Sequence, residues 1–225
     1  MNIVIIGLGG IGSMLCETMA RFLSYSSETK DNLLLVDGDS YEPKNSERQH
    51  FTRMGNKAEV KAADLSMQFS MLNVTSFPAF VNETTISQVI LEGNIVLMCV
   101  DNHKTRMIVS NYCKQLQNVT LISGGNELID GNVQIYIKEN GVDLTPDLCS
   151  YHPEIANPED KLPEEMSCEE LSVSEPQLYF TNLTVATFMC QAFYNAVVKK
   201  QCETSEVYFD IIQMAASAKT RIVKN

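Results

Sequence analysis

The sequence lacks the features of a membrane protein and of a nucleic-acid-binding protein. No apolar run approaches the roughly 18 to 20 residues that a membrane-spanning helix needs. The chain has 17 Lys and Arg against 28 Asp and Glu, a formal net charge of −11, so it offers no basic surface for nucleic acid or an anionic membrane. The first apolar stretch has no basic region before it and contains a turn, unlike a signal peptide, so we expect a cytoplasmic protein.

The sequence also lacks internal repeats, coiled-coil heptads, low-complexity segments and any CxxC pair. Its seven scattered cysteines predict buried small apolar residues in a reducing compartment. With 225 residues, 44% of them hydrophobic, the chain is long enough to bury a sizeable core. We expect a single domain over 1–225, with halves 1–125 and 126–225.

Short β-rich runs alternate with helical stretches in the first half. The expected strands are 2–7, 33–39, 78–83, 94–101 and 120–125, and the expected helices are 12–26, 56–72, 85–91 and 103–117. This rhythm predicts an α/β fold: a Rossmann-like, mainly parallel sheet with helices on both faces.

The second half has a different pattern. Residues 132–139 alternate apolar and polar side chains, which predicts an antiparallel strand, and 206–213 and 219–224 predict two closing strands. The mostly apolar helix expected at 177–198 is a core or interface element. The polar loop at 145–176 is too long for a simple connector, and long ordered loops tend to be functional.

A glycine-rich turn follows the first expected strand and opens the first expected helix. Gly7, Gly9 and Gly12 form G-x-G-x-x-G, with Gly10 added. The first glycine permits a tight turn, the second lets a phosphate approach the backbone, and the third lets helix and strand pack closely. The pattern favours a nucleotide site over a mere packing cluster, without selecting the nucleotide.

Acidic and basic residues follow that a nicotinamide enzyme has no reason to carry. Asp37 ends the second strand where a carboxylate takes ribose hydroxyls, and Asp39 adds a second acid. Arg48 and Lys57 add cations that suit a triphosphate, because charge builds on a departing pyrophosphate. Asp101 ends another strand at the carboxyl edge and can hold Mg²⁺ together with substrate phosphates.

Each of these residues also has a structural interpretation. Arg48 could be a surface cation, Lys57 a solvated lysine with Lys61 as its substitute, Asp39 a loop cap and Asp101 a helix cap. His50 and His103 are expected to be a loop residue and a surface residue. The ordered set is what favours the functional interpretation.

The ordered set resembles the ThiF/MoeB/HesA family, bacterial relatives of ubiquitin-activating enzymes, and the PRTRC-associated ThiF branch is the most similar. The motifs are GLGGIG at 7–12, DGD at 37–39, NSERQ at 45–49, Lys57, and DNHKTR at 101–106. The resemblance implies an adenylyltransferase that uses ATP and Mg²⁺ to adenylate the C-terminal glycine of a ubiquitin-like or sulfur-carrier protein. The implied nucleotide-binding residues are Gly7, Gly9, Gly10, Gly12, Asp37, Asp39, Asn45, Arg48, Gln49, Lys57, Asn102 and Arg106.

The resemblance also implies roles in catalysis and assembly. Asp101 would ligate Mg²⁺, and Arg48 and Lys57 would hold the phosphates. Cys168, in the implied crossover loop, would accept the acyl group, although it could equally be an inert loop cysteine beside several glutamates. The second half would bind the carrier, and a homodimer is expected. Family members often carry a zinc site of two CxxC pairs. Structural zinc is not expected here, because Cys149 and His152 stand where the first pair would be and the C-terminal end has no second pair.

One departure from the family leaves alternatives open. The chain starts at its first strand, so the arginine that many members send from an N-terminal helix into a neighbour's site has no counterpart. Either another cation replaces this arginine, or a partner protein supplies it, or the activity is reduced. The alternatives are a nucleotide-binding partner subunit with little turnover, an ATP-dependent activator of a non-protein carboxylate, and, least favoured, a nicotinamide oxidoreductase.

Overall fold

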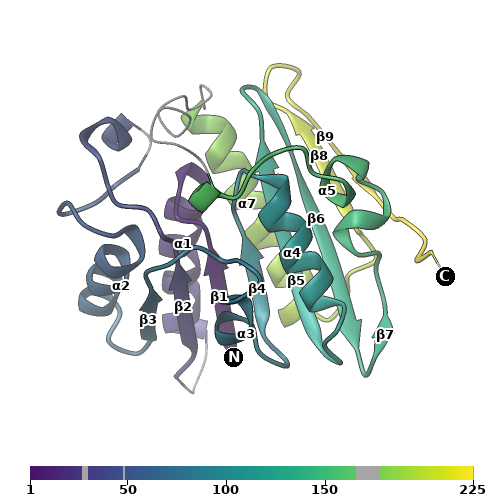
Figure 1. Ribbon diagram of the computed structural model, residues 1–225, viewed down its shortest axis with the longest axis horizontal. Coiled ribbons are helices and arrows are strands. Elements are labelled where there is room, and N and C mark those ends of the chain that lie inside the picture. The colour runs from purple at the N-terminus through teal and green to yellow at the C-terminus, as the bar shows by residue number, and fades with distance from the viewer. Residues whose placement is uncertain (27–29, 48, 166–177, 225) are drawn as a thin grey trace.

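A nine-stranded sheet forms the centre of the molecule and carries helices on both faces (Figure 1). The computed structural model describes residues 1–26, 30–47, 49–165 and 178–224. The strand order is β3-β2-β1-β4-β5-β6-β8-β9, with the short β7 beside β6. The Rossmann-like α/β prediction is therefore confirmed.

The first five strands are parallel. They are β1 (Asn2–Ile6), β2 (Asn32–Val36), β3 (Asn73–Phe77), β4 (Ile95–Met98) and β5 (Val119–Asn126). Successive side chains of a strand point to opposite faces, so Ile3 and Ile5 of β1 enter one apolar cluster while Val4 and Ile6 enter the other. Both faces are buried, which explains why these strands are continuous apolar runs.

Each face of the sheet is covered by its own set of helices. One cluster is closed by α1 (Gly10–Ser26), α2 (Lys57–Gln68) and α7 (Tyr179–Phe193). The opposite cluster is closed by α3 (Ile86–Val89), α4 (His103–Cys113) and α5 (Pro153–Ala156). The rings of Phe22 in α1 and Phe193 in α7 meet edge to face at 5.9 Å. Among the described residues, no helix has both the length and the apolar character needed to cross a membrane.

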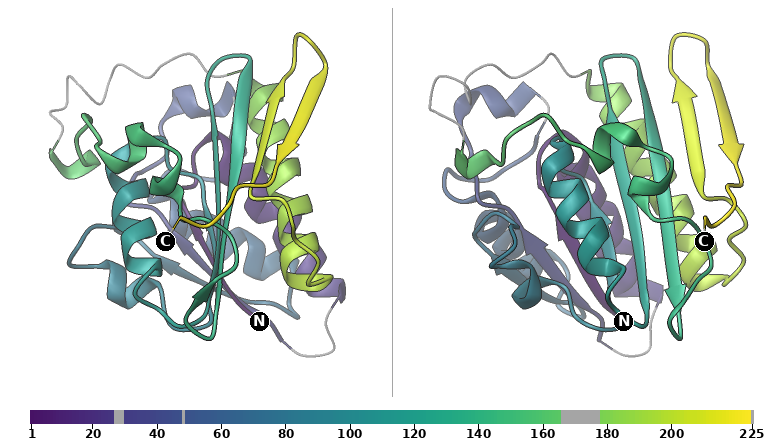
Figure 2. Two further views of the ribbon diagram at one scale, coloured as in Figure 1. Left: turned by 90° about the vertical axis from the view of Figure 1, so that its right-hand side faces the viewer. Right: turned by 45° about the vertical axis from the view of Figure 1, so that its right-hand side comes forward.

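Antiparallel strands extend the sheet in the second half. They are β6 (Asp130–Glu139), β7 (Val142–Asp143), β8 (Glu206–Asp210) and β9 (Ala215–Lys219). The β8–β9 hairpin forms the far edge of the sheet in both views of Figure 2, and every residue of β9 is exposed. The expected antiparallel extension is confirmed.

Two strand predictions were wrong. The third strand is Asn73–Phe77 and not 78–83. Residues 78–83 are apolar for another reason: Val81 packs into the core outside any strand, and the Phe80 ring lies where a Cβ at Gly38 would be. The last strand is Ala215–Lys219 and not 219–224. An exposed edge strand of small residues has no apolar alternation, so the sequence gives no indication of it.

The helix predicted at 177–198 is α7, which continues as a π-helix, η4 (Tyr194–Val198). The part of the predicted loop 145–176 that is described runs to residue 165. It contains η2 (Leu148–Ser150), α5 and η3 (Pro163–Glu165). Short 3₁₀ helices, such as η1 (Pro43–Glu47) between β2 and α2, are the other local elements of the loops.

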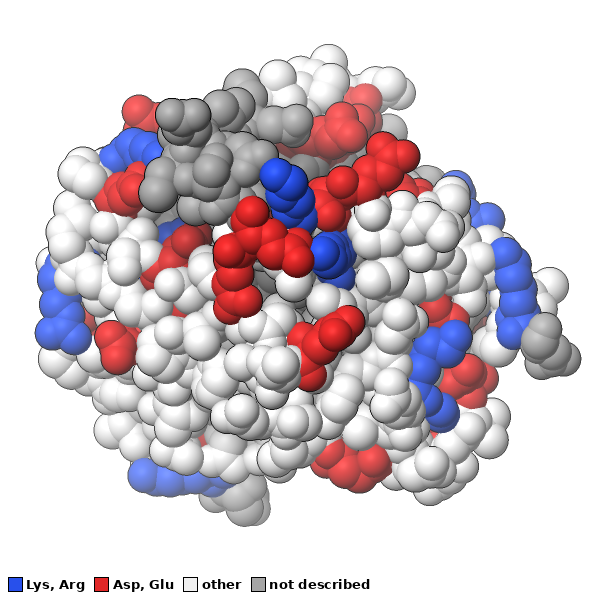
Figure 3. All heavy atoms as spheres, viewed as in Figure 1, with Lys and Arg blue, Asp and Glu red and all other residues white. Residues whose placement is uncertain are grey.

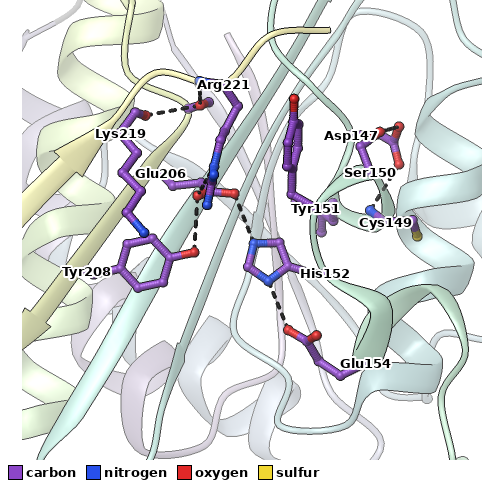
Figure 4. A network of polar contacts seen from close by, with 12 residues as sticks. Asp147, Cys149, Ser150, Tyr151, His152, Glu154, Glu206, Tyr208, Lys219 and Arg221 are labelled. Atoms are coloured by element: carbon purple, nitrogen blue, oxygen red, sulfur yellow. Dashed lines mark hydrogen bonds and ion pairs between the residues drawn. The ribbon is translucent and has the colours of Figure 1, made fainter. Parts of the chain in front are cut away.

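The C-terminal segment after β9 folds back onto η2 (Figure 4). Arg221 Nε donates to Glu206 Oε2 at 2.8 Å, and His152 contacts Glu206 Oε1 at 3.0 Å. The Tyr151 hydroxyl donates to the carbonyl oxygen of Ile222 at 2.7 Å. Burial would raise the pKa of Glu206, but the hydrogen bonds from Arg221 and His152 outweigh it and lower this pKa.

We expect Glu206→Gln to destabilise the protein in a pH-dependent way. Because the folded-state pKa is lowered, the Glu206 carboxylate stabilises the fold above its ordinary pKa of 4.5 and loses this effect as pH falls through the folded value. The difference in unfolding free energy between wild type and Glu206→Gln should be largest at neutral pH and shrink below pH 4.5.

Denaturant unfolding between neutral and acid pH measures this difference. Glu203→Gln is the matched control, because Glu203 is an exposed carboxylate on the connector before β8. It should leave the pH dependence of wild type intact. A Glu206→Gln difference that stays constant with pH would contradict the assignment.

Candidate active site

The glycine turn lies between β1 and α1, at the carboxyl edge of the sheet. Gly7 has a φ of +86°, which glycine adopts without strain. A Cβ at Gly12 would lie 1.9 Å from the carbonyl oxygen of Gly7, whereas a Cβ at Gly9 would have no neighbour within 4 Å. Gly7 and Gly12 therefore shape the turn, while Gly9 leaves an open surface beside the start of α1 at Gly10.

Asp37 fixes the turn from the neighbouring strand. Its Oδ2 accepts the N–H of Leu8 at 2.6 Å and its Oδ1 accepts the N–H of Asp39 at 2.8 Å. The residue is only 8% exposed. Burial raises the pKa of the Asp37 carboxyl, against the opposing effects of Lys57 and the two N–H donors. Both carboxylate oxygens of Asp37 therefore accept hydrogen bonds from backbone N–H groups, an arrangement that the sequence pattern did not indicate.

Lys57 begins α2 and is joined to the DGD segment. Its ammonium lies 3.0 Å from Asp39 Oδ2, and its backbone N–H donates to the carbonyl oxygen of Asp39 at 2.8 Å. The residue is 7% exposed, so it is not a solvated surface lysine. Asn56, which sequence reasoning missed, caps α2 and also donates to the carbonyl oxygens of Asp37 and Asp39.

The NSERQ motif lies on η1 and just after it. Asn45 is buried, and its Oδ1 accepts the N–H of Glu42 at 2.8 Å, so it closes the turn before η1. Gln49 is also buried, and its Oε1 has no hydrogen-bond partner within the described ranges. Arg48, which was predicted to bind phosphate, lies outside the described residues.

The DNHKTR motif connects β4 to α4. Asn102 caps α4 by accepting the N–H of Thr105 at 2.8 Å. Arg106 is buried, and its guanidinium donates to the carbonyl oxygens of Val100 at 2.9 Å and Gly124 at 3.2 Å. Burial lowers the pKa of Arg106, and the nearby Asp101 carboxylate partly offsets this. Asp101 is the exposed member of the motif.

The glycine turn and Asp101 are brought together by direct packing. A Cβ at Gly7 would lie 3.1 Å from the carbonyl of Cys99 and from the backbone nitrogen of Val100, so the turn lies against the residue that precedes Asp101. The structure therefore brings Gly9, Asp39, Lys57 and Asp101 to one edge of the sheet. It gives Asp37, Asn45, Asn102 and Arg106 backbone contacts that hold this edge in shape.

The cysteine predictions have separate outcomes. Cys168 lies outside the described residues. Cys149 is half-buried, and burial raises its pKa. His152, three residues on, is held between Glu154 and Glu206 (Figure 4). In the described parts of the chain, no group of three or more His, Cys, Asp or Glu side chains is arranged to hold a metal ion.

The fold and the open turn define the class of protein: a Rossmann-like α/β protein with a glycine turn at the carboxyl edge of its sheet. The profile of the ThiF family matches residues 1–224, so the chain belongs to this family.

Curated relatives are similar over about the same part of the chain. The molybdopterin-synthase adenylyltransferase of Haemophilus influenzae is 27% identical over 151 residues, covering 65% of this chain and 59% of that protein. The adenylyltransferase and sulfurtransferase MOCS3 of Dictyostelium discoideum is 33% identical over 144 residues, covering 62% of this chain and 32% of that protein. The chain thus spans less than two thirds of these relatives.

A solved structure shows the same fold over nearly the whole chain. The crystal structure of E. coli MccB with ATP superposes with a TM-score of 0.74 at 17% identity, covering 97% of this chain and 63% of that one. At this identity the likeness shows the fold alone.

Substitutions at two glycines should separate ligand approach from folding. Gly9→Ala is expected to change the unfolding free energy by no more than about 0.5 kcal/mol, because its methyl group meets no neighbour. It should nevertheless weaken nucleotide binding, because the methyl group stands where a phosphate would approach. Gly12→Ala is the matched control and should cost about 1–3 kcal/mol of stability through its clash with Gly7. Denaturant unfolding and calorimetric titration with MgATP measure both effects. Wild-type affinity in Gly9→Ala would place the phosphates elsewhere.

Proposed function

We propose that this chain adenylates a carboxylate with ATP, and that the acceptor is the C-terminal glycine of a small ubiquitin-like or sulfur-carrier protein. A carboxylate oxygen attacks the α-phosphorus, the bond from that phosphorus to the bridging oxygen breaks, and pyrophosphate leaves. The observation that supports the proposal is the packing of the glycine turn, with its open Gly9, against the Cys99–Val100 backbone that leads into the exposed Asp101.

The residues present fit ATP and Mg²⁺. Gly9 is open and α1 begins at the next residue, and the first N–H groups of a helix, which lack partners within the helix, favour a bound phosphate. Within the described ranges, the Asp101 carboxylate accepts no hydrogen bond and forms no ion pair, so it is available to a metal. Mg²⁺ usually takes one or two carboxylates plus phosphates and waters, so one acid is a sufficient protein ligand. Bound Mg²⁺ would neutralise charge on the departing pyrophosphate.

Each remaining motif residue has a part in this proposal. Lys57 would bind phosphate in exchange for Asp39, its present partner. The unpaired Gln49 Oε1 can accept a hydrogen bond from a ligand hydroxyl. Arg48 keeps its proposed role as a phosphate-binding cation. Catalysis would then consist of positioning the reactants and neutralising charge. Attack on a phosphorus atom depends on these two effects more than on an acid–base pair.

The identity of the acceptor is supported by the relatives and not by the site. The curated relatives include an adenylyltransferase for molybdopterin synthase and a ubiquitin-like modifier-activating enzyme. A structural neighbour, MccB, was crystallised with MccA. Adenylation of a carboxylate is the reaction that the relatives' names support, and a protein acceptor is the finer part of the proposal.

We also propose a homodimer, to which the exposed Tyr179, Phe180 and Leu183 of α7 would contribute, and sedimentation equilibrium would measure its mass.

Exchange of labelled pyrophosphate into ATP tests the first step. Wild type should catalyse exchange only with a carrier that ends in Gly-Gly, and Asp101→Ala should reduce the rate by about 100-fold or more, the cost of removing a charge-stabilising group. Asp130→Ala, at the exposed first residue of β6, is a control that should keep the wild-type rate. Unchanged turnover in Asp101→Ala rejects the site, and carrier-independent hydrolysis favours a non-protein acceptor or a partner subunit.

The proposal includes a second step at Cys168. Its thiolate would attack the carbonyl carbon of the acyl adenylate, AMP would leave, and a thioester would form. Cys168→Ser should keep pyrophosphate exchange at the wild-type rate and lose the thiol-sensitive carrier adduct seen on a non-reducing gel. Cys149→Ser, at a half-buried cysteine on η2, should keep both. An adduct that survives in Cys168→Ser would reject the second step alone.

A further inference from the structure

A segment we call the strap, residues 160–165, lies on the carboxyl-edge side of the sheet and is fastened to two separate elements. Glu164 accepts hydrogen bonds from Asn82, which follows β3, at 2.9 and 3.2 Å. Glu165 accepts from Lys104 of α4 at 2.7 Å. Figure 3, drawn in the same view as Figure 1, shows acidic and basic side chains side by side above the centre of the molecule. The strap therefore connects the loop after β3 to the first turn of α4.

Asp160, at the start of the strap, accepts the first two N–H groups of α4. Its Oδ2 accepts from His103 at 2.5 Å and its Oδ1 from Lys104 at 3.0 Å. Asn102 already caps the helix in the usual way through Thr105. Asp160 thus adds a charged acceptor from 57 positions along the chain to a helix that has its own cap.

The backbone is held by hydrogen bonds on both sides of Asp101, and we call these two contacts its anchors. On one side, the Arg106 guanidinium holds the carbonyl oxygen of Val100, the residue before Asp101. On the other side, Asp160 holds the N–H of His103, two residues after it. Within the described ranges, Asp101 forms no side-chain hydrogen bond of its own, so these anchors hold the backbone from which its carboxylate extends.

We propose that Asp160 is a positioning residue for Asp101. It holds the start of α4 so that the Asp101 carboxylate stays at the distance and angle at which it can ligate a metal beside the glycine turn. The inference rests on one part of the proposed function, the assignment of Asp101 as the metal ligand, and not on the identity of the reaction. Groups that orient a metal ligand typically change metal affinity or activity by about 10- to 100-fold when removed.

Binding of Mn²⁺ in the presence of ATP, followed by electron paramagnetic resonance, tests the inference without any turnover. Asp160→Ala should raise the half-saturating Mn²⁺ concentration by about 10-fold or more. Asp160→Asn keeps one acceptor oxygen and should recover part of this loss. In carrier-dependent exchange, Asp160→Ala should raise the Mg²⁺ requirement more than it lowers the rate at saturating Mg²⁺.

Glu164→Gln is the matched control, because it weakens the strap at Asn82 and leaves α4 untouched; its metal requirement should equal that of wild type. If Asp160→Ala is less stable but keeps the wild-type metal requirement, Asp160 is only structural and the inference is overturned. If Asp160→Ala fails to fold, Asp160→Asn decides by the same measure. Weakened Mn²⁺ binding without any exchange in wild type would reject the proposed function and support the inference.

Discussion

The site depends on a buried carboxylate that accepts hydrogen bonds from backbone on both sides. Asp37 joins Leu8 of the glycine turn to Asp39 of the next strand's end, and Asn56 extends the connection to the start of α2. Burying an ionised carboxylate is costly, and here two N–H donors and Lys57 offset part of that cost, although burial still raises the pKa of Asp37. The turn is thereby fixed before any ligand arrives.

Arg106 is a second buried charged residue that holds backbone atoms, here beside the end of β4. Its guanidinium is buried, and its N–H groups hold the carbonyl oxygens of Val100 and Gly124. Burial thus divides the ordered motifs into two kinds of residue. Asp37 and Arg106 use their charge on backbone atoms, whereas Asp39 and Asp101 keep exposed carboxylates that a ligand could reach. A rigid frame with a few exposed charged groups is what a positioning mechanism requires.

The sequence predicted the parallel core because strands buried on both faces are continuous apolar runs, as in β1 and β4. It could not predict β9, whose exposed small residues lack a pattern. Within the site, the sequence pointed to Asp101 and Lys57. It could not reveal the backbone contacts of Asp37 or the position of Asp160, because their partners lie 29 and 57 positions away in the chain. Spacing alone does not show which distant segment a carboxylate meets.

The charge balance around the turn gives a physical reason for a metal to accompany the nucleotide. Lys57, Lys61 and Lys104 each already pair with a carboxylate, from Asp39, Glu17 and Glu165 respectively. A triphosphate that entered alone would have to displace these acids, and the released carboxylates would repel it. In the proposed site, a divalent cation between Asp101 and the phosphates would offset much of that repulsion, including that from the Asp39 carboxylate once Lys57 has released it. These paired lysines therefore favour a nucleotide that carries its own cation.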